Sequence, residues 1–69
     1  MPYKTIDDLT EDQQLAIACM VEDGNPISAG ALLHEYLGYT LPAPMRMRGV
    51  LRIYRDLGGE KTFEFQKYL

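Results

Sequence analysis

Three residues in the second half of the chain can bind anions through their guanidinium groups and are spaced to share one side of a helix. They are Arg48, Arg52 and Arg55. In a helix, at 100° per residue, they fall within about 60° of one another, and we call them the arginine face. Guanidinium groups donate paired hydrogen bonds to phosphate or carboxylate oxygens, and this spacing can follow a groove. The alternative is an ordinary solvated helix face, partly neutralised by Asp56 and Glu60.

Residues for nucleophilic catalysis or metal binding are scarce. Ser28, His34 and Cys19 are the only residues of their types, so one chain can form neither a disulfide framework nor a nitrogen–sulfur site with four ligands. We expect Ser28 to be a helix cap and Cys19 a small buried hydrophobic residue. The sequence therefore predicts a non-enzymatic protein with no catalytic residue, no metal and no cofactor.

Three helices are expected to position these residues, at about residues 11–23, 29–37 and 44–57. Thr10 and Gln13 form a capping box at the start of the first helix. A glycine follows each of the three, which is typical of a helix end. The third helix therefore carries the arginine face.

The third predicted helix is amphipathic. Its apolar residues share a third of the circumference opposite the arginine face: Met47, Val50, Leu51, Tyr54 and Leu57. Arg46 lies nearer this apolar side, and we expect it to bend out to solvent or to pair with an acid of the first half. We therefore expect the apolar side to be buried and the arginine face to be exposed.

A half-buried strand is predicted after the third helix. Phe63 and Phe65 alternate with polar residues, which indicates a strand at about residues 62–66. A strand needs a neighbour, and the candidates are residues 3–6 and the stretch around Ile27. The predicted fold class is mainly α, an α+β arrangement of three helices and one short sheet.

This layout resembles a winged helix-turn-helix domain with a truncated wing. The resemblance rests on residues 27–33, 36–38 and 50–59, whose small residues, apolar pairs and leucine–glycine ending are similar to the pattern of such domains. It implies that the third helix is a recognition helix, which on this hypothesis enters the major groove of duplex DNA. The residues expected to contact DNA are Arg46, Arg48, Arg52, Arg55 and, in the preceding turn, Tyr39.

The charge of the chain is unevenly divided. The 69 residues include 7 Lys or Arg and 10 Asp or Glu, giving a net charge of −3 and a pI near 4.9. Residues 1–40 hold one lysine against seven acids, a net −6, and residues 41–69 hold six Lys or Arg against three acids, a net +3. Two classes of protein fit this charge distribution. One is a DNA-binding regulator or accessory factor, and the other is a small acidic inhibitor or adaptor that binds protein, of the kind that phages and mobile elements encode.

The first predicted helix is apolar on every side over residues 15–21. Because so small a domain cannot cover every side of one helix, we expect the uncovered side to form a homodimer. The expected interface residues are Leu15, Ile17, Met20 and Val21. The alternative is a monomer whose exposed side is formed by Ala16 and Ala18. No signal peptide or membrane-spanning run is found, so we expect one cytoplasmic domain over residues 1–69.

Overall fold

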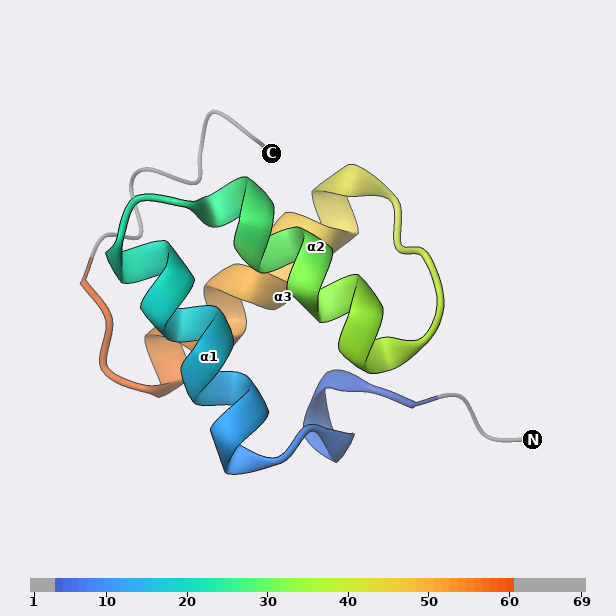
Figure 1. Cartoon of the computed structure of the whole chain (residues 1–69), viewed down its shortest axis with the longest axis horizontal. Coiled ribbons are helices and arrows are strands. Elements are labelled where there is room, and N and C mark those ends of the chain that lie inside the picture. The colour runs from blue at the N-terminus through green and yellow to red at the C-terminus, as the bar shows by residue number, and fades with distance from the viewer. Residues whose placement is uncertain (1–3, 61–69) are drawn as a thin grey trace.

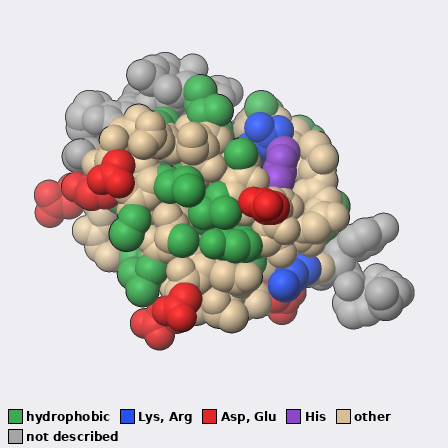
Figure 2. Space-filling view, viewed as in Figure 1, with side chains coloured by type: hydrophobic (Ala, Val, Ile, Leu, Met, Phe, Trp, Pro, Cys, Tyr) green, Lys and Arg blue, Asp and Glu red, His purple; other side chains and the backbone are tan. Residues whose placement is uncertain are grey.

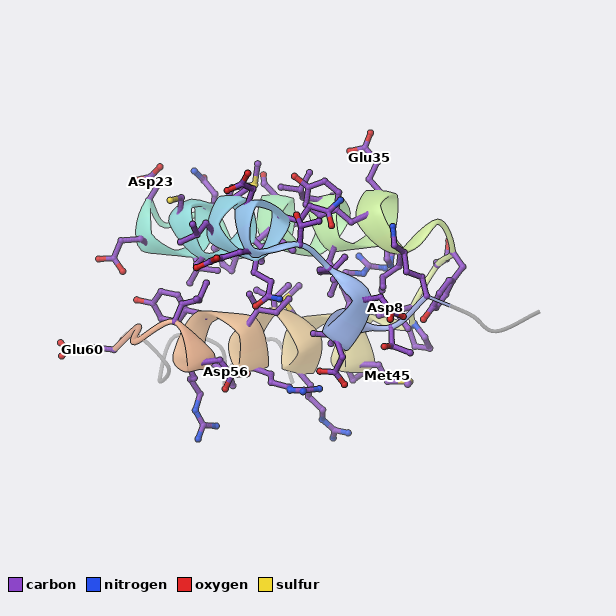
Figure 3. All side chains as sticks on the ribbon, turned by 90° about the horizontal axis from the view of Figure 1, so that it is seen from below. Asp8, Asp23, Glu35, Met45, Asp56 and Glu60 are labelled. Atoms are coloured by element: carbon purple, nitrogen blue, oxygen red, sulfur yellow. The ribbon has the colours of Figure 1, made fainter. Side chains whose placement is uncertain are left out.

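The computed structural model describes residues 4–60, which form three α-helices and one short 3-10 helix. The elements are η1 (Ile6–Asp8), α1 (Glu11–Glu22), α2 (Pro26–Leu37) and α3 (Ala43–Asp56). In Figure 1, α3 runs behind α1 and α2. Figure 3, turned by 90°, shows α1 and α2 in one layer and α3 in the other. One side of α3 therefore faces the other two helices, and the opposite side faces away from them.

The capping box predicted for α1 is confirmed. The Gln13 backbone N–H donates to Thr10 Oγ1 at 3.1 Å, and the Thr10 N–H donates to Gln13 Oε1 at 2.9 Å. The helix ends at Glu22, one residue before the predicted end. Gly24 then takes a φ of +84°, a left-handed conformation that glycine adopts without strain.

Helix α2 begins three residues earlier than predicted, at Pro26. A proline cannot continue the preceding helix, but its fixed φ and missing N–H suit the first position of a new one. Ser28 therefore lies inside the helix, and its predicted role as a cap is wrong. Ile27, expected to be extended, is helical and 62% exposed.

No sheet forms within residues 4–60. The strand predicted at residues 62–66 lies outside the described residues. Both partners predicted for it are wrong, because Ile6 belongs to η1 and Ile27 to α2. The mainly helical character is confirmed, and α3 lies within one residue of its predicted start and end.

The core lies between the two layers. It consists of Leu9, Ile17, Val21, Ala29, Leu33, Leu37, Met47, Val50, Ile53 and Tyr54. The predicted apolar stripe of the third helix is buried except for Leu51, which is half-buried, and Leu57, which is 38% exposed. The prediction that Cys19 is buried is wrong, because it lies nearly opposite Ile17 on α1 and is exposed. Within residues 4–60, no helix has the length and apolar character needed to span a membrane.

Candidate nucleic-acid interface

The arginine face lies on the side of α3 that faces away from α1 and α2. Arg48, Arg52 and Arg55 are all exposed. Four and three residues separate successive members, so the row extends for about 10 Å along the helix axis. The amphipathic pattern predicted this exposure correctly.

Arg52 is held by two carboxylates. Its Nη2 lies 2.6 Å from Asp7 Oδ1, and its Nε lies 3.8 Å from Asp56 Oδ2. These side chains are between 54% and 73% exposed, so each pair contributes about 0–1 kcal/mol. The neutralising role of Asp56 was expected from the sequence, whereas Asp7 is 45 residues away and no local pattern indicated it.

Arg48 and Arg55 have no ion-pair partner within residues 4–60. Neither guanidinium group forms a hydrogen bond to another side chain of that part of the chain. Two of the three members of the arginine face can therefore bind an external anion without first breaking an ion pair within residues 4–60.

Arg46 does not belong to this surface. Its side chain is half-buried, and Nη2 donates to the Leu41 carbonyl at 3.1 Å, so the side chain is neither fully extended into solvent nor paired with an acid of residues 4–60. It lies against Gly30 of α2, where a Cβ would come within 2.7 Å of Arg46 Cδ. Its Nε is buried with no hydrogen-bond partner among the described residues. Arg46 thus holds α3 to α2 and to the turn, and its predicted DNA contact is not supported.

The turn between α2 and α3 is held by one side chain from each of these helices. Nε2 of His34 lies 2.9 Å from the Leu41 amide nitrogen and 3.2 Å from its carbonyl oxygen, while Arg46 binds the same carbonyl. His34, which had no evident partner in the sequence, is therefore a structural residue. These contacts fix where the first turn of α3 begins.

Tyr39 was expected to contact phosphate from this turn. Its hydroxyl instead donates to the Lys4 carbonyl at 2.7 Å, and its ring is half-buried against the core. Tyr39 therefore joins the N-terminal segment to the turn.

The four residues predicted for the homodimer interface do not lie together on the surface. Ile17 and Val21 are 0% and 1% exposed and belong to the core of their own chain, which makes them unavailable to a second copy. Leu15 is 44% exposed and Met20 is half-buried. Figure 2 shows hydrophobic side chains gathered near the centre of the face formed by α1 and α2, with acidic side chains around them.

Comparison with known proteins gives no match among protein-family models, curated proteins or solved structures. The resemblance to winged helix-turn-helix domains therefore stays a prediction from the residue pattern. Within the described residues, no group of three or more His, Cys, Asp and Glu side chains could hold a metal ion.

Proposed function

We propose that this protein is a small non-enzymatic DNA-binding protein, a transcriptional regulator or accessory factor, that inserts α3 into the major groove of duplex DNA. The observation that carries the proposal is the side of α3 that faces away from α1 and α2, with its three exposed arginines. The 14 residues of α3 extend for about 21 Å, and the major groove, about 12 Å wide, accepts a helix.

The distribution of charge makes DNA binding compatible with a net charge of −3. Helix α3 contains four arginines and one acid, whereas the acids of α1 and α2 belong to the opposite layer. DNA that approaches this side of α3 meets three arginines and two acids, Asp7 and Asp56, which are both paired with Arg52. Because charges more than about 10 Å apart are screened near 0.1 M salt, the distant acids weaken binding less than the local arginines strengthen it.

Fluorescence anisotropy with a random duplex, at about 50 and 200 mM salt, tests the proposal. Three phosphate contacts give a slope of log affinity against log salt of about −3. Arg48→Gln combined with Arg55→Gln should reduce that slope to about −1. Lys4→Gln removes an exposed charge outside α3 and should leave it unchanged. Absence of binding at the lower salt concentration contradicts the proposal.

Homodimer formation remains part of this proposal, because a dimer presents two copies of α3 to successive half-sites about one helical turn apart. We propose that Leu15 and Met20 carry its interface on α1, because they are the two predicted residues that reach the surface. Sedimentation equilibrium at about 100 micromolar, well above the range for a specific dimer, should give twice the 7.9 kDa of one chain. A dimer that withstands Leu15→Asp combined with Met20→Asp has its interface elsewhere.

The apolar side chains on the α1–α2 face favour a second candidate, an acidic protein-binding inhibitor or adaptor. Half-buried apolar residues of these two helices include Ala16, Ala18, Met20, Leu32 and Tyr36. Apolar groups surrounded by charged ones are typical of protein-binding surfaces. This candidate predicts that the arginine variants still bind the protein partner as tightly as the unchanged chain does. The DNA-binding proposal predicts that the same variants lose affinity for DNA.

A further inference from the structure

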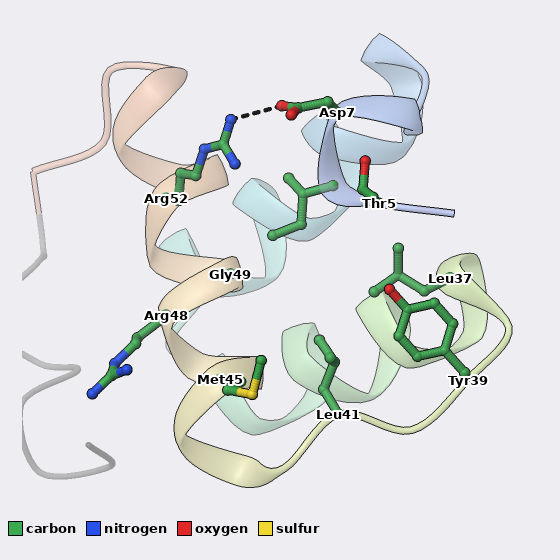
Figure 4. A pocket seen from close by; sticks show the side chains of 10 residues that line it. Thr5, Asp7, Leu37, Tyr39, Leu41, Met45, Arg48, Gly49 and Arg52 are labelled. Atoms are coloured by element: carbon green, nitrogen blue, oxygen red, sulfur yellow. Dashed lines mark hydrogen bonds and ion pairs between the residues drawn. The ribbon is translucent and has the colours of Figure 1, made fainter. Parts of the chain in front are cut away.

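A cavity of about 390 Å³ opens where η1, the end of α2, the following turn and the first half of α3 meet. Its size falls within the range of small-molecule sites, about 300–1,000 Å³. Figure 4 shows that its walls come from segments far apart in the sequence. The apolar part of the wall includes Ile6, Leu37, Leu41 and Met45.

Gly49 of α3 allows one wall of the cavity to form. A Cβ at this position would lie 2.8 Å from Ile6 Cδ1 and 3.0 Å from Leu33 Cδ2, so a larger residue would displace these methyl groups, whereas glycine lets Ile6 lie directly on α3. Ile6 in turn is packed against the core. This contact places η1 along the cavity.

Two further contacts hold the N-terminal segment in place. The hydroxyl of Tyr39 binds the Lys4 carbonyl at 2.7 Å, and Asp7 pairs with Arg52 at 2.6 Å. The segment is thus attached on both sides of Ile6. These contacts fix one wall of the cavity, which is open to solvent on its outer side.

The charged groups at the cavity favour a ligand with one negative charge. Arg48, Arg52 and Asp7 line it, and together they leave one unit of positive charge. Asp7 and Arg52 are paired with each other, whereas Arg48 has no ion-pair partner within residues 4–60. In Figure 4 the guanidinium group of Arg48 points away from the cavity, and rotation about its side-chain bonds brings it over the opening.

We propose that this cavity binds a small apolar monocarboxylate, with the hydrocarbon part against Ile6, Leu41 and Met45 and the carboxylate on Arg48. The apolar walls disfavour sugars and other polar ligands. The surplus positive charge disfavours cations, and Asp7 disfavours a second negative charge on the ligand. This inference does not rest on DNA binding, because the cavity exists whether or not α3 enters a groove.

Titration of ¹⁵N-labelled protein with octanoate tests the inference, with octanol and octylamine as neutral and cationic probes of equal chain length. Octanoate should produce saturable shifts at the amides of Thr5, Leu41 and Gly49. Its affinity should exceed that of octanol by about five-fold, the effect of one solvent-exposed charge pair, and octylamine should bind more weakly than octanol. Arg48→Gln should remove the preference for octanoate. Arg55→Gln, on the same helix but outside the cavity, should retain it.

A pair of opposite substitutions at Met45 makes the test independent of folding. Met45 lines the cavity and is 53% exposed, so both variants should fold. Met45→Glu should weaken octanoate binding, and Met45→Lys should strengthen it, by about five-fold in each direction, with octanol unaffected. Equal affinity for all three probes, absence of saturation, or shifts confined to α1 would overturn the inference.

Discussion

The outer surface of α3 and the outer surface of the α1–α2 layer enclose the same core but differ in chemistry. The first carries three exposed guanidinium groups, and the second carries apolar side chains among acids. Net charge averages the two surfaces and describes neither. The difference shows that one small, acidic chain can present a locally basic helix, provided that most of its acids lie on other elements.

The largest expected effect is a loss of stability from a substitution in the core that the two surfaces share. Leu33 of α2 is 0% exposed, and its side chain lies beside Gly49 of α3. Leu33→Ala should lower the free energy of unfolding by about 2–5 kcal/mol, because it removes buried methyl groups and leaves a cavity. Urea denaturation followed by circular dichroism measures this loss. Ile27→Ala, at a position 62% exposed on the same helix, should change stability by less than about 0.5 kcal/mol.

A smaller effect concerns the contact that joins α3 to α1. The hydroxyl of Tyr54, a residue only 2% exposed, donates to Glu22 Oε2 at 2.6 Å. Tyr54→Phe should lower the free energy of unfolding by about 1–2 kcal/mol, because it removes the hydrogen bond to the charged Glu22 and the one that the hydroxyl accepts from the Glu60 N–H at 3.3 Å. Tyr36→Phe is the matched control, since no hydrogen bond of its hydroxyl is found within residues 4–60. Equal losses in the two variants would contradict a specific role for the Tyr54–Glu22 bond.

The smallest effect tests whether Asp7 competes with phosphate for Arg52. Asp7→Asn removes the 2.6 Å ion pair and should increase affinity for duplex DNA by about two- to five-fold, the value of an exposed pair. Asp23→Asn changes the net charge equally at the end of α1 and should have a smaller effect. Anisotropy titrations of the two variants at the same salt concentration give the comparison. Identical gains would mean that net charge, and not release of Arg52, controls affinity.

Features encoded by neighbouring residues were predicted from the sequence. The capping box of Thr10 and Gln13 and the exposure of the arginine face depend only on residues within one or two turns. The start of α2 was missed because Pro26 is equally consistent with ending one helix and with beginning the next. The error was therefore local, and it affected only the assignments of Pro26, Ile27 and Ser28.

Features that depend on tertiary contacts were not predicted. The apolar run at residues 15–21 does not indicate which side is covered, so Cys19 was expected to be buried and Ile17 to face a partner. Arg46 turns inward because the Leu41 carbonyl and the space beside Gly30 accept it. The sequence pattern specifies neither of these contacts.

The most direct test of the central claim is chemical-shift mapping of the labelled protein with duplex DNA. The account predicts that the perturbed amides cluster between Arg48 and Arg55 on α3, and that residues of α1 and the outer side of α2 change little. The perturbations should disappear in the Arg48→Gln, Arg55→Gln double variant at moderate salt. Shifts centred on the α1–α2 face, with α3 unaffected, would contradict the assignment of DNA binding to the arginine face.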